Sequence, residues 1–477
     1  MDRSLGVIII FTILGLISIS AQAPDTLWTR TYGGLYGDMG LSVQQTADGG
    51  YIIGGITQAD SGAPMQIYLI KTDSVGGLIW ERVYAGVLSF NGGDPLVQQT
   101  KDGGYIITGG RVDSTGKEKV YLLKTSATGD SLWAKILGGY SGGTAVRETK
   151  DGGYVITGAT YIRPSSAVYL VKTNSQGDSV WANSYNWIFD DKGYSVHETK
   201  DGGYIITGYS ETEDLYEVYL VKTNGQGDSI WAKTYGGIMD DIGFSVQETS
   251  DGGYIIVGRT WSFGSGGLGI YLIKTDDRGN QLWWKKLGGP MQDVGYTIRV
   301  TSDGGYIIGG WTTSYGAGRG DFYLIKTDSL GTIIWTKTIG GPDQDKGFSA
   351  TQTSDGGYII VGWTSSYGAG MTDVYLVKLG ADIGIKEELP IRLKENQKIL
   401  KGSNFFRNKV TLSFGSPTMD PLRINLYNAC GASVYNCFYR DTPAIFSLED
   451  LKNLSSGIYF LSIQSGPRCW RIKLVKP

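Results

Sequence analysis

Short runs of alternating apolar and polar residues fill most of the chain, and glycine or aspartate bounds each run. Between residues 193 and 234 there are four such runs, rich in β-branched and aromatic side chains, at 193–199, 203–208, 217–223 and 229–234. Runs of this length and period are typical of β-strands and not of helices. The pattern therefore predicts an all-β chain of many short strands.

The four-run unit recurs seven times, about 50 residues apart. Three markers each occur seven times: the tetrapeptide Asp-Gly-Gly-Tyr, the motif Tyr-Leu-x-Lys and a tryptophan, the first of which, Trp28, precedes the first tetrapeptide. Four strands in about 50 residues are the size of one propeller blade. The sequence predicts a seven-bladed β-propeller over residues 24–380. The Asp-Gly-Gly-Tyr motifs begin at Asp48, Asp102, Asp151, Asp201, Asp251, Asp303 and Asp355.

Two tight turns join the strands of each unit. Asp-Gly in the first turn favours a hairpin, because glycine accepts the positive φ that such a turn needs. The second turn has the pattern Thr-Asp/Asn-x-x-Gly-x-x-x-Trp, as at residues 173–181. The lysine of Tyr-Leu-x-Lys is expected to extend to solvent from its strand, or to snorkel, with a covered aliphatic stem and its ammonium in solvent.

The second turn resembles the tryptophan-docking motif of quinoprotein-type propellers and, more loosely, the Asp-box of sialidase-type propellers. As a whole, residues 24–380 resemble the secreted DGGYII-repeat propellers of bacteria and archaea. The quinoprotein pattern implies that the tryptophan lies on the outermost strand of its blade. The chain begins with such a strand at residues 26–32, and its last repeat ends with a third strand at 373–379. We expect these two segments to pair and close the seventh blade.

One face of the predicted ring varies from blade to blade. The first and second turns are nearly identical in all units and lie on one face, whereas the loops between second and third strands differ and lie on the other. Variable loops on a rigid scaffold commonly form binding sites. Aromatic rings suit sugars, although the same rings could instead pack the loops against neighbouring blades. The candidate ligand-binding residues on this face are Trp187, Tyr209, Arg259, Trp261, Trp311, Tyr315, Trp363 and Tyr367.

Five blades carry an aspartate just before the first strand, on the same face. A ring of carboxylates could bind Ca²⁺. Alternatively, each carboxylate accepts backbone N–H bonds and caps a turn within its own blade. No other cofactor is expected. The five candidate metal ligands are Asp38, Asp191, Asp241, Asp293 and Asp345.

Composition narrows the chemistry. His197 is the only histidine, which excludes multi-histidine zinc sites, and its alignment with Gln, Arg and Thr in other blades favours a structural role. The three cysteines, Cys430, Cys437 and Cys469, form no CxxC and could include one disulfide. Residues 386–477 have a net charge of +7, which leaves −10 on residues 1–385. An acidic ring argues against nucleic acid as a partner.

The N-terminus is typical of a secretory signal peptide over residues 1–23. Arg3 provides a positive start, residues 5–19 form an apolar run, and residues 21–23 offer a small-residue cleavage site. The run is short for a membrane span, and an uncleaved anchor helix is the alternative. The sequence therefore predicts a secreted or cell-surface protein.

The repeat stops at residue 379, and a charged, irregular linker is expected at 381–402. Six alternating segments then predict a small β-sandwich over residues 403–477. The segments 408–414, 431–435 and 454–461, with the terminal 473–476, look like the C-terminal sorting domain of type IX secretion substrates. At residues 403–406 the chain has Ser-Asn-Phe-Phe where that family usually has Pro-Asn-Pro-Phe. The resemblance implies export across a Gram-negative outer membrane, with the type IX machinery as a partner.

The function expected is that of a binding or scaffold module for glycan or protein, present as a monomer. A glycan-active hydrolase or lyase, or a quinoprotein-like dehydrogenase, on the variable-loop face is the alternative. A purely structural surface-layer component is another. No catalytic residue stands out from the repeat.

Overall fold

A computed structural model describes residues 22–86, 96–162, 165–186, 189–212, 215–263 and 267–382, and shorter stretches between residues 400 and 476. The chain divides into two compact units, residues 1–382 and 383–477. Residues 1–21 of the expected signal peptide, and most of the expected linker, lie outside the described residues. No helix among the described residues has the length and apolar character to cross a bilayer.

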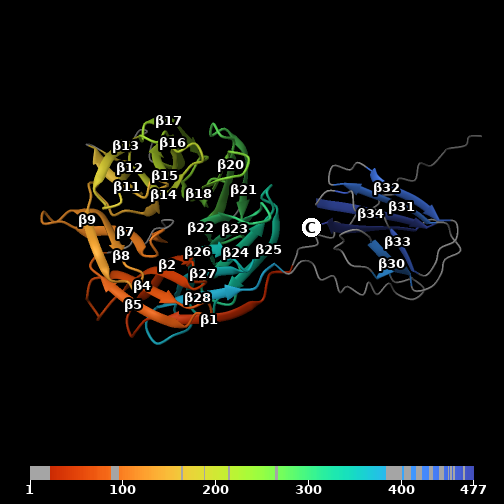
Figure 1. Ribbon diagram of the computed structural model, residues 1–477, viewed down its shortest axis with the longest axis horizontal. Helices are drawn as coiled ribbons and strands as arrows, with labels where there is room; N and C mark the ends of the chain where they lie inside the picture. Colours follow the sequence, from red (N-terminus) through yellow and green to blue (C-terminus); the bar gives the residue numbers. More distant parts are fainter. Residues whose placement is uncertain are drawn as a thin grey trace, which may run out of the picture. The chain divides into compact units, whose positions relative to one another are not determined.

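In its described residues, unit 1 forms seven four-stranded antiparallel sheets arranged as the blades of a ring (Figure 1), which confirms the predicted propeller. In order from the innermost strand outward, the blades are as follows. Blade 1 is β2 (Asp38–Gln45), β3 (Tyr51–Thr57), β4 (Gln66–Thr72) and β5 (Leu78–Tyr84), and blade 2 is β6 (Val97–Gln99), β7 (Tyr105–Val112), β8 (Glu118–Thr125) and β9 (Ser131–Ile136). Blade 3 is β10 (Ala145–Glu148), β11 (Tyr154–Ile162), β12 (Ser165–Thr173) and β13 (Ser179–Tyr185), and blade 4 is β14 (Asp191–Glu198), β15 (Tyr204–Thr212), β16 (Leu215–Thr223) and β17 (Ser229–Tyr235). Blade 5 is β18 (Asp241–Glu248), β19 (Tyr254–Thr260), β20 (Gly269–Thr275) and β21 (Gln281–Leu287), and blade 6 is β22 (Asp293–Val300), β23 (Tyr306–Thr312), β24 (Asp321–Thr327) and β25 (Ile333–Ile339). Blade 7 is β26 (Asp345–Gln352), β27 (Tyr358–Thr364), β28 (Asp373–Leu379) and β1 (Thr26–Tyr32).

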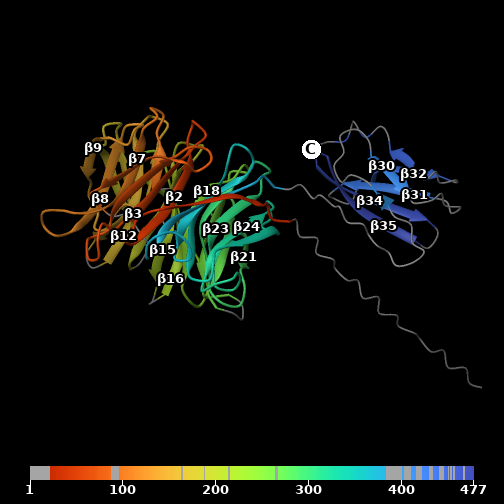
Figure 2. The ribbon, with the colours of Figure 1, turned by 90° about the horizontal axis from the view of Figure 1, so that it is seen from below.

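The ring closes on itself. Each blade contacts the next one, and blade 7 contacts blade 1 through β26, β27 and β2. The first strand of the chain, β1, supplies the outermost strand of the last blade, where Thr31 pairs with Tyr375 and Arg30 with Leu376. In Figure 2 the blades are seen edge-on. We call the face with the first-to-second and third-to-fourth turns of each blade the turn face, and the face with the second-to-third loops and inter-blade connections the loop face.

Each residue of the Asp-Gly-Gly-Tyr turn has a separate task, shown here for blade 1. Gly49 has a φ of 82°, which disfavours any residue with a Cβ. A Cβ on Gly50 would lie 2.1 Å from the carbonyl oxygen of Thr72 and 2.6 Å from Nζ of Lys71, so this position has no room for a side chain. Asp48 accepts hydrogen bonds from the backbone of Gly50 and the hydroxyl of Thr46.

The expectation that the lysine of Tyr-Leu-x-Lys extends to solvent is wrong. In all seven blades this lysine is buried, and its ammonium lies 2.8–3.0 Å from the carboxylate of the Asp-Gly-Gly-Tyr aspartate in the same blade. It also donates to the carbonyl of the residue that follows it, as Lys71 does to Thr72. The third strand is covered by neighbouring blades on both sides, so the side chain must find its partners inside its own blade.

The repeat tryptophans join each blade to the next. For six of them, ring atoms lie 2.5–2.9 Å from where a Cβ would sit on the glycine of the next blade's third-to-fourth turn. That glycine has a φ of 70–82° in each case. The tryptophan–glycine pairs are Trp28–Gly76, Trp80–Gly129, Trp133–Gly177, Trp181–Gly227, Trp231–Gly279 and Trp283–Gly331.

The seventh tryptophan has a different partner, because blade 7 has no such turn. Trp335 is fully buried, and its Nε1 donates to Asp382 over 2.8 Å. The other oxygen of Asp382 accepts from the hydroxyl of Tyr358, 2.6 Å away. Asp382, which the sequence places in an irregular linker, thus completes the packing between blades 6 and 7.

Unit 2 contains a three-stranded sheet in the order β29-β30-β33 and a four-stranded sheet in the order β32-β31-β34-β35. Ile424, Leu426 and Leu461 are buried on one side of the larger sheet. These are the sheets of the predicted C-terminal β-sandwich. The expected disulfide involves cysteine side chains that lie outside the described residues. The strands are β29 (Leu400–Lys401), β30 (Val410–Phe414), β31 (Leu422–Asn428), β32 (Ser433–Tyr439), β33 (Ile445–Leu448), β34 (Gly457–Ser465) and β35 (Arg468–Lys476).

Candidate functional site

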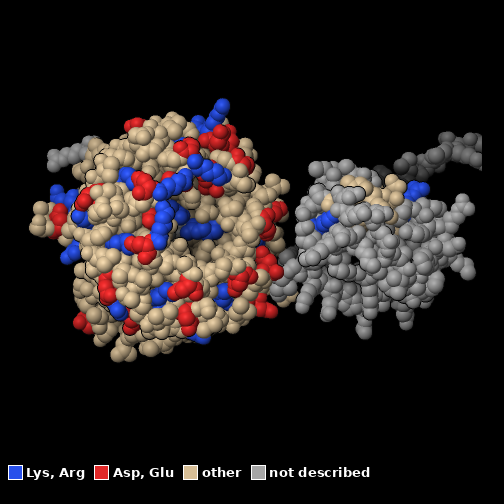
Figure 3. Space-filling model, viewed as in Figure 1, with Lys and Arg blue, Asp and Glu red and all other residues tan. Residues whose placement is uncertain are grey.

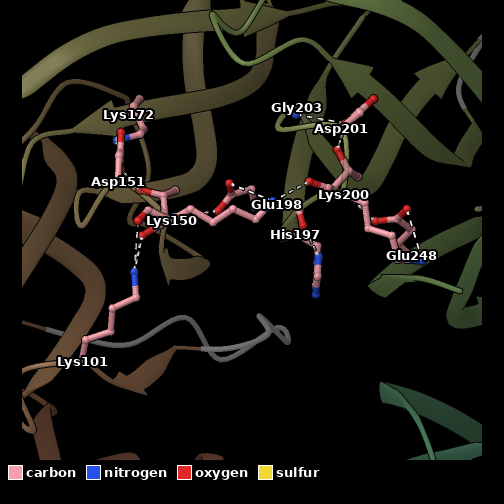
Figure 4. A network of polar contacts seen from close by, with 12 residues as sticks. Lys101, Lys150, Asp151, Lys172, His197, Glu198, Lys200, Asp201, Gly203 and Glu248 are labelled. Atoms are coloured by element: carbon pink, nitrogen blue, oxygen red, sulfur yellow. Dashed lines mark hydrogen bonds and ion pairs between the residues drawn. The ribbon is translucent and has the colours of Figure 1, made fainter. Parts of the chain in front are cut away.

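The turn face is held together by contacts between blades. The backbone N–H of Lys150 donates to Glu198, and that of Lys200 to Glu248, one blade further on (Figure 4). On the face that Figure 3 shows, Lys and Arg side chains gather around the centre of unit 1, with Asp and Glu beside them. His197 lies on β14 and its Nδ1 is 2.8 Å from the carbonyl oxygen of Glu198. The ammonium groups of Lys101 and Lys200 also donate to the carbonyls of Thr149 and Thr249, so these two lysines join adjoining blades.

The five aspartates predicted as metal ligands begin the innermost strands β2, β14, β18, β22 and β26 and are buried. Asp345 is typical of most of them, because it accepts from the backbone of Gly341 over 2.7 Å and from the hydroxyl of Ser366 over 2.8 Å. The carboxylate thereby fixes the inter-blade connection to the second-to-third loop. The described residues contain no group of three or more His, Cys, Asp or Glu that could hold a metal ion. The Ca²⁺ site stays a prediction.

A second aspartate adjoins two of these aspartates at the blade junctions. Asp321 and Asp345 both adjoin Gly340. If Gly340 had a Cβ, that atom would lie 2.0 Å from an oxygen of Asp321 and 2.8 Å from an oxygen of Asp345. Asp373 and Asp38 adjoin Gly33 in the same way, at 2.8 and 2.4 Å. Burial raises the pKa of Asp321, and the charge of Asp345 raises it further. These carboxylates are fully buried, so they do not meet a substrate from solvent.

The loop-face end of the inner wall carries a continuous belt of aromatic rings. One ring comes from each innermost strand of blades 4 to 7: Tyr194, Phe244, Tyr296 and Phe348. Successive ring centroids are 5.3, 5.1 and 4.9 Å apart. Each ring sits where the innermost strand has a bulge, as at Tyr296 between Gly295 and Thr297, and each is nearly buried. We call these four rings the aromatic belt.

Cations lie on the aromatic belt. Nζ of Lys346 is 5.3, 5.1 and 5.3 Å from the ring centroids of Tyr296, Trp311 and Phe348. At the other end of the belt, Nζ of Lys192 is 5.3 Å from the ring of Tyr194. Burial lowers the pKa of Lys192. Such contacts between an ammonium and ring faces are attractive, and they fix where the positive charges lie.

Two nitrogen donors beside the belt have no acceptor. The Nε of Arg259 and the Nε1 of Trp311 are buried, and neither makes a hydrogen bond to any residue that the structure describes. Arg259 pairs with Ile242 on the innermost strand of blade 5, and Trp311 with Val294 in blade 6. Both therefore stand at the level of Lys192 and Lys346, one strand further out. Both nitrogens are therefore donors without an acceptor among the described residues, which is uncommon for buried polar groups.

The predicted ligand-binding residues divide into three groups. Tyr209, Trp311 and Trp363 are half-buried and pack against the cluster that contains the aromatic belt. Trp261, Tyr315 and Tyr367 are 38–45% exposed on the second-to-third loops of blades 5, 6 and 7. Trp187 lies outside the described residues. The first two groups and Arg259 are on the loop face, in blades 4 to 7.

The loop tyrosines are held in place by their own blades. The ring of Tyr315 packs on Tyr323 and that of Tyr367 on Tyr375, at 5.6 and 5.5 Å. The hydroxyl of Tyr367 donates to the carbonyl of Gly340 over 3.0 Å. Packing and ligand contact, the two roles expected for these rings, are therefore both compatible with the structure, because one face of each ring packs on its blade and the rest is exposed.

The belt and its cations were not singled out from the sequence. Their signal is the motif Asp-x-Gly-Phe/Tyr, with the ring three residues after the aspartate, in blades 4 to 7. Blade 1 has Leu41 at this position. The aspartate of the motif drew attention as a metal ligand, whereas the neighbouring ring has the more distinctive position.

Several solved structures resemble the chain at low identity. Sqt1 from Chaetomium thermophilum is 11% identical, with a TM-score of 0.43 over 75% of this chain and 98% of that one. The β-propeller domain of the Trilobed protease from Pyrococcus furiosus is 8% identical, with a TM-score of 0.42 over 74% and 94%. The NanB sialidase from Streptococcus pneumoniae is 10% identical, with a TM-score of 0.39 over 76% and 70%. None of these similarities indicates what this chain binds.

The C-terminal unit gives the more specific match. No curated protein matches the chain. Residues 404–476, however, match the family model of the secretion system C-terminal sorting domain. This match agrees with the type IX sorting domain expected from the sequence and indicates export, with release or attachment at the cell surface. The chain is thus a β-propeller joined to a C-terminal domain of the secretion-system sorting family.

Proposed function

We propose that this protein is a secreted or surface-attached glycan-binding module whose site is the loop-face end of the ring in blades 4 to 7. The observation that carries the proposal is a set of loop-face rings in blades 5 to 7: Trp261, Tyr315 and Tyr367 are 38–45% exposed, and Trp311 and Trp363 are partly exposed against the cluster that contains the aromatic belt. Aromatic rings offer flat apolar faces that stack on sugar rings, and nearby polar groups fix the orientation of the hydroxyls.

The turn face supports the proposal by contrast. Its ionic side chains are satisfied by partners in the same or the adjoining blade, as the seven lysine–aspartate pairs are. Its turns are also nearly the same in every blade. Repetition of this kind suits a scaffold, whereas the loop face differs from blade to blade.

The acids of the described residues do not favour the hydrolase alternative. Retaining and inverting glycosidases need two carboxyl groups that face the substrate. Two neighbouring carboxyl pairs, Asp321 with Asp345 and Asp373 with Asp38, are buried and accept from backbone N–H groups of their own loops. Binding without turnover is therefore the function that the geometry supports best.

The test is calorimetric titration of residues 24–477 with a panel of neutral and charged oligosaccharides. We expect at least one to bind, and the double variant Trp311→Ala/Trp363→Ala to weaken it tenfold or more. The matched control is Trp284→Ala, because Trp284 is also partly exposed but lies on the outermost strand of blade 5. Absence of binding across the panel, or equal loss in the control, would contradict the proposal. Release of reducing ends from a bound polysaccharide would establish the hydrolase instead.

A further inference from the structure

We propose that the glycan is anionic, and that its carboxylate or sulfate groups are bound by Lys346 at one end of the aromatic belt and by Lys192 and Arg259 at the other end. This inference rests on the proposed function and adds the chemical class of the ligand. The three cations come from three blades, and their side chains reach the same belt of rings.

The cations have no carboxylate partner. None of Lys192, Arg259 and Lys346 forms an ion pair within 4.0 Å with another residue that the structure describes. Glu118 is near enough to act electrostatically on Lys192. Its side chain extends over Gly110, where its Oε1 lies 1.8 Å from the position that a Cβ would take. By contrast, every lysine of the Tyr-Leu-x-Lys motif has its aspartate. The charge of Glu118 thus offsets part of the charge of Lys192, whereas no ion pair with a described residue offsets the charge of Lys346 or of Arg259.

The buried donors favour the same ligand. A neutral sugar hydroxyl can donate as well as accept, whereas a carboxylate or sulfate only accepts. The free Nε of Arg259 and Nε1 of Trp311 are both donors, and so are the two ammonium groups. Hydrogen bonds to a charged acceptor are shorter and stronger than neutral ones. Four donors with no carboxylate among them therefore match an anionic group best.

The aromatic rings decide between a saccharide and other anions. Lys346 lies over the rings of Tyr296, Trp311 and Phe348, so an anionic group that binds its ammonium lies next to aromatic surface. A sugar acid has an apolar ring face next to its carboxylate and can contact both. A long polyphosphate has no such face, and the acidic remainder of the ring repels it.

The experiment compares four probes on residues 24–477 by calorimetry: tetragalacturonate, a sulfated chondroitin tetrasaccharide, cellohexaose and a glutamate octapeptide. We expect one or both of the acidic sugars to bind at least tenfold more tightly than cellohexaose. Binding should weaken by tenfold or more between 50 and 500 mM NaCl, because ions screen the attraction. Preference between the two acidic sugars then assigns the carboxylate or the sulfate.

The variant Lys346→Met should weaken binding of the acidic sugar by tenfold or more and leave the affinity for cellohexaose unchanged. Its matched control is Lys285→Met, because Lys285 also lies over a tryptophan ring, 5.8 Å from Trp283, but on an outermost strand. If Lys346→Met does not fold, as judged by its melting temperature, Arg259→Gln takes its place with the same expected loss.

Each outcome is decisive. Equal affinity for cellohexaose and the acidic sugars would overturn the anionic assignment and leave the proposed function standing. If none of the three saccharides bound, both the anionic assignment and the proposed function would be overturned. Tighter binding of the glutamate peptide than of the acidic sugars would show that the site takes an acidic polypeptide, and would also overturn the proposal.

Discussion

The ammonium of Lys326 lies 2.8 Å from the carboxylate of Asp303, and the two residues join the third strand of blade 6 to its first turn. Lys326 is fully buried, and it donates also to the carbonyl of Thr327. Because the same contact occurs in every blade, one local arrangement fixes all seven first turns.

This arrangement predicts how stability depends on pH. Burial raises the pKa of Asp48, but the hydrogen bonds from Lys71 and Thr46 outweigh it and lower the pKa to about 2. In the unfolded chain the pKa of an aspartate is about 3.9. Because the pKa in the folded protein is lower, the ionised aspartate stabilises the fold at pH values above about 3.9, and this stabilisation is lost as the pH falls toward 2. We expect the free energy of unfolding, measured with denaturant, to fall steeply between pH 4 and pH 2. A flat profile in this range would contradict the pairing.

The variant Lys326→Met tests one pair directly. It leaves Asp303 without its cation and removes three hydrogen bonds, so we expect a loss of about 1–3 kcal/mol. Thermal and urea unfolding measure this loss. The control Lys285→Met removes a half-exposed lysine from β21 and should cost much less.

The pairing of β1 with β28 predicts the effect of shortening the chain. Deletion of residues 24–33 removes the outermost strand of blade 7 and exposes the edge of β28. We expect a lower melting temperature for the whole ring and aggregation on heating. Deletion of residues 403–477 is the control, because that segment belongs to the other compact unit. If the variant without residues 24–33 melted at the same temperature as the full chain, the pairing of β1 with β28 would not be needed to close the ring.

Asp382 is predicted to stabilise the junction of blades 6 and 7. The variant Asp382→Ala leaves Nε1 of Trp335 and the hydroxyl of Tyr358 without their acceptor, at a cost of about 1–3 kcal/mol. Urea unfolding, followed by tryptophan fluorescence, measures it. Asp343→Ala, at an exposed aspartate in the neighbouring connection, should change stability little. Equal effects of the two variants would show that Asp382 has no special role.

The acid pair at the same junction predicts the opposite pH dependence. Burial and the charge of Asp345 raise the pKa of Asp321. The contribution of Asp321 to stability is therefore fully present at pH values below its pKa in the unfolded chain. It is lost as the pH rises through its pKa in the folded protein. The variant Asp321→Asn should be as stable as the parent near pH 4 and more stable by about 0.5–1 kcal/mol at pH 8. A parent that is the more stable of the two at pH 8 would refute this.

Much of the fold follows from the sequence, because the repeat supplies seven independent copies of each pattern. In blade 4 the expected strands at 193–199 and 203–208 correspond to β14 and β15 within a few residues. Turn chemistry is local, so glycine and aspartate define it without reference to the rest of the chain. The residues of β1 are also those expected to close blade 7.

The candidate site followed less directly, because it depends on contacts between blades. Period-two alternation indicates which residues share a side of a strand, but the bulge at each belt residue shifts that alternation by one. The position of Lys346 over Trp311 joins residues 35 apart in the sequence, on different blades. For the same reason the lysines of Tyr-Leu-x-Lys were expected in solvent, since a strand pattern alone does not show that neighbours cover both sides.

A crystal structure of residues 24–477 with a bound acidic oligosaccharide tests the central claim most directly. The account predicts the sugar at the loop-face end of the ring, with its carboxylate or sulfate groups beside Lys346 and Arg259 and its ring against Trp311. Saccharide bound on the turn face or along the outermost strands, with the belt in contact only with solvent, would contradict it.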